Sequence, residues 1–214
     1  MLISCWSVKG GSGTTVAAAA LSLLLARNHP DGALAIDVAG DLPAALGVSS
    51  PIGPGLGDWL DADEAVGGEA LLDLAVPAVD HLGLIPAGRP TVGSVDRWRT
   101  AAAALADDHR AIVVDCGGPY PPVPLLECAD QSLLVIRPCY LALRRATDLP
   151  GRVTGVVLVS EPGRCLGARD VESVVGVPVV ADIPFEPAVA RAVDAGLLGA
   201  RLPMSLGRAL RAVA

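Results

Sequence analysis

Continuous apolar runs of strand length alternate along the chain with longer segments of helix-forming residues. The runs cover residues 2–8, 33–37, 82–88, 111–115, 133–136, 155–159 and 177–181. Helical composition or spacing marks residues 16–26, 95–108, 187–195 and 204–213, with further helices beginning near Tyr140 and Ala168. Runs that are apolar at every position are typical of parallel strands buried on both faces. The pattern predicts a doubly wound α/β fold, with a mainly parallel sheet of seven or eight strands and helices on both faces.

A single domain is expected for the whole chain, residues 1–214. The composition is 52% hydrophobic and 18% charged, which supplies a sizeable core and is unlike that of disordered chains. Between residues 38 and 77, glycine and proline interrupt short helical pieces around 42–46, 57–60 and 69–74. We interpret this stretch as surface excursions rather than as a second domain.

A glycine-rich loop joins the first apolar run to the first helix. Its residues are Lys9, Gly10, Gly11, Ser12, Gly13, Thr14 and Thr15. Glycines let a backbone come close to a ligand, and the loop amides and the positive end of the helix would face one anionic group. Compared with the pattern G-x-x-x-x-G-K-[ST], Gly13 and Thr15 are in place, but Val8 replaces the first glycine and Thr14 replaces the lysine. The sequence therefore predicts a phosphate cradle without its usual lysine.

Two aspartates close apolar runs, Asp37 after the second and Asp115 after the fourth. Ligands of parallel sheets sit beyond the carboxyl ends of the strands. We therefore expect the glycine loop and both carboxylates at one edge of the sheet.

The loop from Lys9 to Thr15 resembles the deviant Walker A loop, K-G-G-x-G-K-[ST], of the ParA/MinD family of positioning ATPases. The resemblance implies that these residues bind ATP or ADP with Mg²⁺, and that Lys9 reaches across a homodimer to the partner's nucleotide. Lys9 is also the only lysine in a chain with fifteen arginines, and it stands where a compact ammonium would touch phosphate. The alternative is a chance lysine in a strand-to-helix turn.

The resemblance also implies a metal site and a switch region. Asp115 resembles a Walker B carboxylate that holds Mg²⁺ through water, with Thr15 and Asp37 as further metal-site residues; the alternative is a strand-end aspartate that caps a turn. Residues 37–47 resemble the switch I region, where active members carry D-x-D. Ala39 takes the place of the second acid, and Asp41 resembles the later acid of the CpaE/TadZ branch that would help to place the attacking water.

The part of the family pattern that reads the base is altered. Val159 and Ser160 stand where the family commonly has an asparagine for adenine. Residues 182–187 resemble the family's I-P-x-D segment, which implies that Pro184 and Glu186 lie near the base. Glu186 takes the place of the aspartate.

The cysteines indicate neither a cluster nor disulfides. The string Asp-Cys-Gly-Gly at 115–118 also resembles the nitrogenase iron protein, but that cluster needs a second cysteine after the third strand, and residues 86–90 have none. An odd number of cysteines, five, without a C-x-x-C pair favours small core residues in a reducing cytoplasm. The chain begins on its first strand, so no signal peptide is expected, and the histidines are scattered.

The function that the resemblance implies is a nucleotide-dependent dimeric switch that positions a cellular assembly. That assembly would belong to chromosome or plasmid partition, the septum site or a Flp/Tad-type pilus. Losing one charge-assisted phosphate contact costs roughly 1.5–3 kcal/mol, or about ten- to a hundredfold in affinity. Hydrolysis suffers more, because the lysine would neutralise charge in the transition state. We therefore expect weak or lost ATP hydrolysis.

Two other function classes stay open. One is a non-enzymatic pseudo-ATPase scaffold that binds no nucleotide. The other is a small-molecule enzyme of dethiobiotin synthetase or cobyrinate amidase type, which is disfavoured because those enzymes need the missing lysine.

The carboxyl-terminal segment differs in charge from the rest. Residues 187–214 carry four arginines and one acid, in a chain of net charge −7. Relatives use basic residues here to hold DNA non-specifically, or an amphipathic tail to hold a membrane. Leucines at 202, 206 and 210 with Val213 are spaced for one helical face. The alternative is a last helix packed on the sheet with its arginines in solvent.

Overall fold

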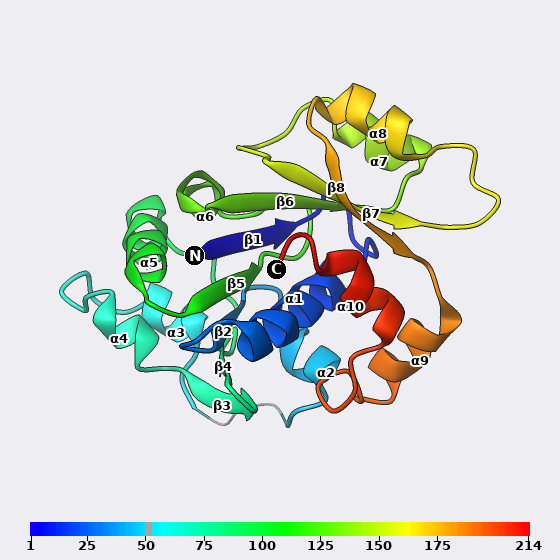
Figure 1. The fold of residues 1–214 in the computed structure, drawn as a ribbon. Helices are drawn as coiled ribbons and strands as arrows, with labels where there is room; N and C mark the ends of the chain where they lie inside the picture. The colour runs from blue at the N-terminus through cyan, green and yellow to red at the C-terminus, as the bar shows by residue number, and fades with distance from the viewer. Residues whose placement is uncertain (50–52) are drawn as a thin grey trace.

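A computed structural model describes residues 1–49 and 53–214 of the chain (Figure 1). The strands are β1 (Leu2–Trp6), β2 (Ala33–Asp37), β3 (Val76–Val79), β4 (Leu82–Ile85), β5 (Ala111–Asp115), β6 (Gln131–Ile136), β7 (Gly155–Ser160) and β8 (Val179–Pro184). The helices are α1 (Thr14–Asn28), α2 (Leu42–Leu46), α3 (Leu56–Leu60), α4 (Glu69–Leu72), α5 (Val95–Asp107), α6 (Val123–Cys128), α7 (Tyr140–Arg145), α8 (Ala168–Val175), α9 (Pro187–Asp194) and α10 (Met204–Leu210).

The strands form one eight-stranded sheet in the order β3-β4-β2-β5-β1-β6-β7-β8. Every neighbouring pair is parallel except β3 and β4, which are antiparallel at one edge. The predicted doubly wound, mainly parallel α/β sheet is therefore confirmed. In this order β1 lies in the middle, with β5 on one side and β6 on the other, so the loop that leaves β1 is flanked by both.

The two faces of the sheet are covered by different helices (Figure 1). Successive side chains of a strand point to opposite faces, and β1 shows this clearly. Ile3 and Cys5 pack with α1, α2 and α10, whereas Leu2 and Trp6 pack with α3, α5 and α6. Both clusters are continuous across the sheet, which explains why its central strands are apolar at every position.

Helix α1 is the most deeply buried helix. Its alanines at positions 17–20 are fully buried, and their small side chains let the helix lie close to the sheet. The one polar residue of its buried side, Ser22, donates its hydroxyl to the Ala18 carbonyl at 2.8 Å. A helix held this tightly fixes the position of the glycine loop at its amino end.

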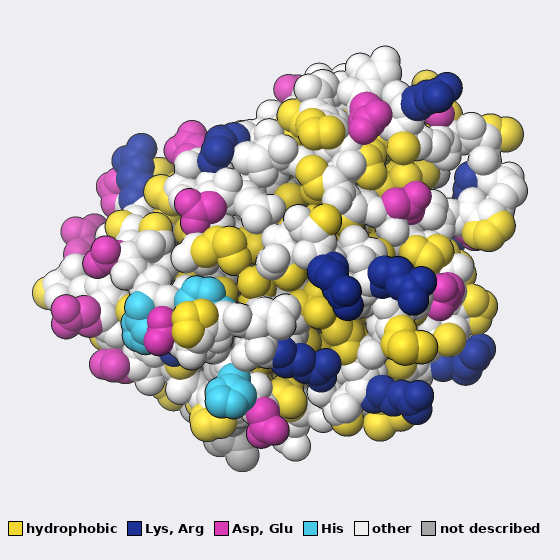
Figure 2. All heavy atoms as spheres, viewed as in Figure 1, with side chains coloured by type: hydrophobic (Ala, Val, Ile, Leu, Met, Phe, Trp, Pro, Cys, Tyr) yellow, Lys and Arg dark blue, Asp and Glu magenta, His cyan; other side chains and the backbone are white. Residues whose placement is uncertain are grey.

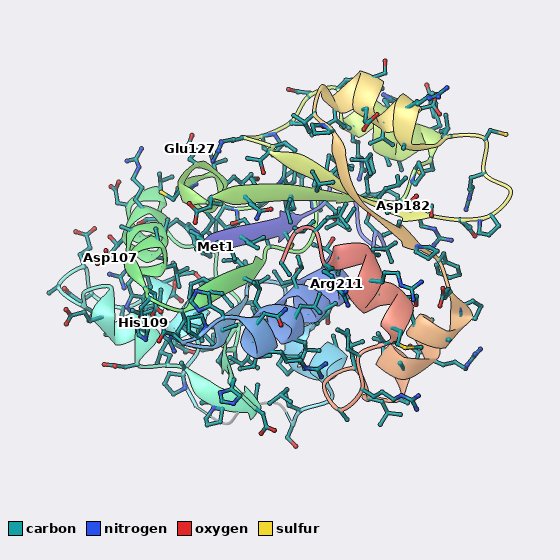
Figure 3. The ribbon with its side chains drawn as sticks, in the orientation of Figure 1. Met1, Asp107, His109, Glu127, Asp182 and Arg211 are labelled. Atoms are coloured by element: carbon teal, nitrogen blue, oxygen red, sulfur yellow. The ribbon has the colours of Figure 1, made fainter. Side chains whose placement is uncertain are left out.

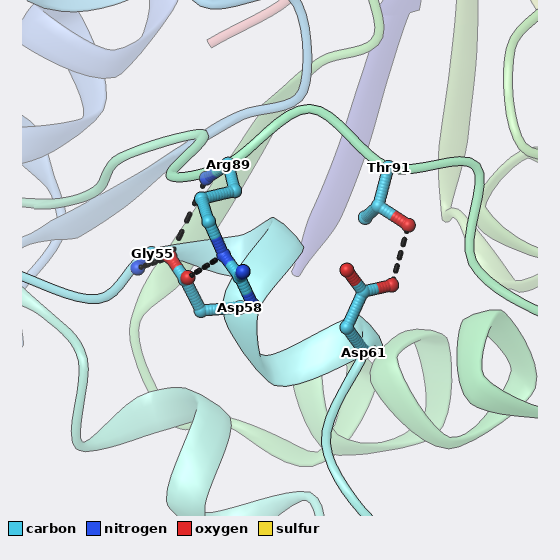
Figure 4. Close-up of polar contacts among 5 residues, drawn as sticks. All are labelled: Gly55, Asp58, Asp61, Arg89 and Thr91. Atoms are coloured by element: carbon cyan, nitrogen blue, oxygen red, sulfur yellow. Dashed lines mark hydrogen bonds and ion pairs between the residues drawn. The ribbon is translucent and has the colours of Figure 1, made fainter.

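Helix α3 holds the loop that follows β4 (Figure 4). The Asp58 carboxylate accepts hydrogen bonds from the Gly55 amide at 2.8 Å and from the Arg89 guanidinium at 2.7 Å. The Thr91 hydroxyl donates to Asp61 at 2.5 Å. The bonds from Gly55 and Arg89 lower the pKa of Asp58 below its usual value.

Several sequence predictions need correction. The stretch 38–77 is more than a surface excursion, because Leu56, Trp59 and Leu71 are buried and complete the core beneath α5. The last strand runs Val179–Pro184 and not 177–181. Strand β3 and helix α6 were not predicted at all. The strand was missed because it is a short, half-buried edge strand that contains Pro77.

The cysteines divide by burial. Cys5 and Cys116 are buried core residues, as predicted, while Cys128 and Cys165 are exposed. Within the part of the chain that the structure describes, no helix is long and apolar enough to cross a membrane.

Candidate functional site

The glycine loop forms an open ring of backbone amides at the carboxyl edge of the sheet. Gly11 has φ 73° and Gly13 has φ 89°, values that only glycine adopts readily. The first helical hydrogen bond of α1 runs from the Ala17 amide to the Gly13 carbonyl at 2.9 Å. Among the described residues, the amides of residues 10–16 donate no hydrogen bond. These amides and the amino end of a fifteen-residue helix are therefore available to one anion.

Side chains hold this loop in shape from behind. The Ser7 hydroxyl lies 2.8 Å from the Lys9 carbonyl oxygen and 3.0 Å from that of Gly117. Ser12 donates its hydroxyl to the same Lys9 carbonyl at 3.0 Å, and Arg145 of α7 donates to the Val8 carbonyl at 3.2 Å. These contacts join the loop to the segment after β5 and to α7.

The loop encloses a cavity of about 270 Å³. Its walls are Ser7, residues 10–16, Ala39, Asp41 and residues 117–118. Thr14 is 6% exposed and belongs to the wall without closing the cavity. Lys9 is half-buried, lies outside this lining, and donates its ammonium to the adjacent Gly10 carbonyl at 3.1 Å. The cradle is therefore open, and Lys9 is not part of its wall.

Asp115 brings a buried carboxylate to the base of the loop. Its Oδ1 accepts a hydrogen bond from the Gly117 amide at 3.0 Å. Its Oδ2 is buried and has no hydrogen-bond partner among residues 1–49 and 53–214. Burial raises the pKa of Asp115 to about 6, against the opposing effects of the Thr15 hydroxyl and the Gly117 amide. An unpartnered buried carboxylate oxygen beside a threonine hydroxyl is a fitting environment for a hydrated cation.

Asp37 uses its carboxylate to shape the following turn. Oδ1 accepts from the Gly40 amide at 2.7 Å and Oδ2 from the Leu42 amide at 3.3 Å. Burial raises its pKa, and these backbone bonds oppose that rise. The turn brings Asp41, which is exposed, to the wall of the loop cavity. In the described chain no three His, Cys, Asp or Glu side chains are arranged as a ready metal centre, so the metal roles of Thr15, Asp37 and Asp115 stay predictions.

A second cavity of about 260 Å³ adjoins the first, and the two share Gly13 and Val16 as walls. Apolar side chains of α1, β7, β8, α9 and α10 dominate its lining. Pro184 and Glu186 both lie here, on the side where their predicted role near a base would place them. The Glu186 carboxylate accepts a hydrogen bond from the Ser205 hydroxyl at 2.9 Å.

Sequence reasoning missed an arginine cluster at this edge. Arg137 follows β6 and pairs with Glu161, which follows β7, at 2.7 Å. Arg164 contacts the same Glu161 carboxylate at 2.8 Å. The Arg137 guanidinium also lies 4.8 Å from the ring centre of Phe185, a wall of the apolar cavity. Arg137 comes directly after an apolar run, which is the signal that could have revealed it.

Basic side chains gather over α9, α10 and the end of α1 (Figure 2), and Figure 3 labels Arg211 on this surface. Arg191, Arg201, Arg208 and Arg211 are exposed and take part in no ion pair within the described chain. Beneath them Leu206, Leu210 and Val213 are buried in the core that contains α1. The apolar face of the last helix is thus already packed against the protein.

Several solved structures share this architecture. A ParA family ATPase from Chlorobium tepidum TLS aligns with a TM-score of 0.77 and 22% identity, covering 99% of this chain and 98% of that one. The septum site-determining protein MinD from Pyrococcus horikoshii OT3, solved with Mg-ADP, gives 0.74 and 20% over 99% and 93%. The MinC:MinD cell division protein complex of Aquifex aeolicus gives the same TM-score, identity and coverage. The sequence matches no family model and no curated protein.

The chain therefore has the fold of these solved ParA and MinD structures. The TM-scores establish the fold. Because the sequence identities are below one quarter, the chemistry of the site has to be argued from its own residues.

Proposed function

We propose that this protein is a ParA/MinD-type switch that binds Mg-ATP or Mg-ADP at its glycine loop, dimerises around it, and positions a cellular assembly. The observation that carries the proposal is the ring of free amides at residues 10–16, which stays open although its lysine is missing. A polyphosphate would accept from these amides, and the dipole of α1 would favour its charge.

The residues below the cradle fit a magnesium ion. Mg²⁺ retains much of its water and prefers oxygen ligands. The Thr15 hydroxyl lies at the loop, and the unpartnered Oδ2 of Asp115 offers a buried acceptor for a water of the ion. When bound, the metal would supply the phosphates with positive charge, which the uncharged Thr14 cannot do.

Turnover is proposed to be slow or absent. Thr14 brings no cation to the phosphates, and Ala39 brings no acid to the switch region. Asp41 is the remaining carboxylate on the cavity wall and is the candidate that would orient a water. Without the lysine's charge in the transition state, Asp41 alone would support little hydrolysis.

Lys9 is proposed to act on a second copy of the chain. Its ammonium makes one hydrogen bond, to a neighbouring carbonyl, and lies outside the wall of its own cavity. A side chain held this weakly would be free to meet a phosphate of a facing partner. The dimer would then depend on nucleotide.

The partner assembly is proposed to belong to partition, division or secretion. The relative from A. aeolicus forms a complex with another division protein. For this chain the four exposed arginines between residues 191 and 211 favour DNA. Leu206, Leu210 and Val213 are buried, although Leu197 and Met204 nearby are exposed, so the amphipathic face predicted from the sequence is not available to a membrane. Retention on DNA that falls steeply with salt and is lost in Arg208→Ala/Arg211→Ala supports this, whereas binding only to anionic vesicles contradicts it.

The alternative is a scaffold of the same fold that binds no nucleotide. Thermal unfolding with Mg-ATP, Mg-ADP or neither separates the two, because a ligand at a hundred times its dissociation constant stabilises by about 2.7 kcal/mol. We expect both nucleotides to raise the Tm of wild type, and Asp115→Ala to lose most of the rise. Arg99→Ala, an exposed change on α5, serves as the control. An unchanged Tm with either nucleotide would establish the scaffold.

A further inference from the structure

The apolar cavity beside the glycine loop has few groups that could read a base. Among the described residues that line it, only Glu186 and Asp194 have polar side chains. Neither of them is a buried polar group, because Glu186 is half-buried and accepts the Ser205 hydroxyl at one oxygen, while Asp194 is exposed at the end of α9. At the rim, the Phe185 amide is paired with the Ser160 carbonyl at 2.7 Å. Where a hydrogen-bonding side chain would meet a base at the end of β7, the wall is Val159.

The cavity is nevertheless suited to a flat apolar group. Its volume is about 260 Å³, it shares Gly13 and Val16 as walls with the phosphate cradle, and Phe185 is among its lining residues. The Arg137 guanidinium, itself paired with Glu161, lies 4.8 Å from the centre of the Phe185 ring. An aromatic ring stacks on any base, because every base has a π-face.

We propose that this cavity holds the base of a bound nucleotide by apolar contact and stacking, without hydrogen bonds to its edge, so that the site scarcely distinguishes adenine from guanine. The inference rests on the proposed nucleotide binding and adds a claim about which bases the site accepts. Strong discrimination between similar ligands requires buried polar groups that a wrong ligand leaves unpaired, and an apolar pocket lacks them.

The test measures binding of Mg-ATP, Mg-GTP and magnesium tripolyphosphate to the full chain by titration calorimetry. We expect ATP and GTP to bind with dissociation constants within about fivefold of each other, since apolar pockets discriminate weakly. Phe185→Ala should weaken both by a similar factor, about tenfold, and leave tripolyphosphate binding unchanged. Arg137→Ala should weaken them less, and Arg164→Ala, which shares Glu161 but does not lie over the ring, should match wild type.

The outcomes separate this inference from the proposed function. ATP bound more than about thirtyfold tighter than GTP would overturn the inference and leave the nucleotide switch standing, since that ratio exceeds what stacking supplies. Equal loss of tripolyphosphate binding in Phe185→Ala would also overturn it, by showing a general effect on the cradle. Failure of all three ligands to bind would overturn both proposals together.

Discussion

Asp37 and Asp115 lie directly opposite each other on the neighbouring parallel strands β2 and β5, and both side chains are buried. The charge of Asp37 adds to burial in raising the pKa of Asp115, and exposed Asp41 adds further to it. The charges of Asp37 and Asp41 are thus near enough to act on Asp115. A divalent cation would relieve this unfavourable charge, which gives the acidic edge a physical reason to bind one.

The raised pKa of Asp115 predicts the direction in which the free energy of unfolding changes with pH. The folded chain holds a proton on Asp115 up to about pH 6, whereas the unfolded chain releases it near 3.8. The contribution of this group to the free energy of unfolding therefore falls as the pH rises from about 4 to 6. The Asp115→Asn variant lacks this titration, so it should not lose stability in this way. The free energy of unfolding of the variant relative to that of wild type should therefore increase by on the order of 2–3 kcal/mol between pH 4 and 8.

Urea unfolding of both proteins across that pH range measures the difference. Asp58→Asn is the matched control, because the pKa of Asp58 is lowered by Gly55 and Arg89 and its contribution is lost on acidification. The difference between that variant and wild type should change with pH in the opposite direction. A pH-independent difference for Asp115→Asn would show that its carboxyl titrates normally.

Restoring the missing lysine should strengthen nucleotide binding. Thr14 lines the loop cavity, so the side chain of Thr14→Lys can extend into the space that phosphates would occupy. One charge-assisted contact is worth roughly ten- to a hundredfold in affinity. We expect Mg-ATP to bind tighter by such a factor, with faster phosphate release in a steady-state assay.

Thr14→Met tests whether charge causes the gain, since it fills similar space without an ammonium. Its affinity for Mg-ATP should equal or fall below that of wild type. If the methionine and lysine variants behaved alike, the cradle would not be a phosphate site.

The fold could be predicted from local patterns, because strands such as Ala111–Asp115 are apolar enough to be strands in any compact context. Elements that depend on their surroundings were missed or misplaced: α6, which begins beside Pro122, was not predicted, and β8 was predicted at 177–181 although it continues through the exposed Asp182 to Pro184. The glycine loop was visible because its chemistry is local. The contacts that hold it join distant segments, as between Arg145 and Val8, and no sequence spacing indicates them.

The contacts of the buried Arg97 predict that even a conservative substitution by lysine would cause a large loss of stability. It is 5% exposed, stacks 3.6 Å from the Trp59 ring centre, and donates to the carbonyls of Val66 at 2.7 Å and Trp59 at 2.6 Å. A lysine cannot make both bonds while stacking. Arg97→Lys should cost on the order of 2–4 kcal/mol in urea unfolding. Arg99→Lys, in an exposed pair with Asp96, should cost less than about 0.5 kcal/mol, and equal losses would contradict the buried role.

Gly47 links the turn after α2 to the loop between α9 and α10. An added Cβ would lie 1.7 Å from the Gly196 carbonyl oxygen, and the Gly199 amide donates to Leu46 at 3.1 Å. Its φ of 73° adds about 1 kcal/mol of strain for a residue with a side chain. Because the overlap is with backbone, Gly47→Ala should cost about 3 kcal/mol or more by thermal unfolding.

Two alanine variants separate strain from overlap. Gly40 has a φ of 94° with open space at its Cβ, so Gly40→Ala should cost about 1 kcal/mol from strain alone. Gly10 has neither a positive φ nor a close neighbour, so Gly10→Ala should lie within about 0.5 kcal/mol of wild type. Any other order of the three losses would contradict the close approach of residues 47 and 196, and with it the packing of the turn after α2 against the loop between α9 and α10.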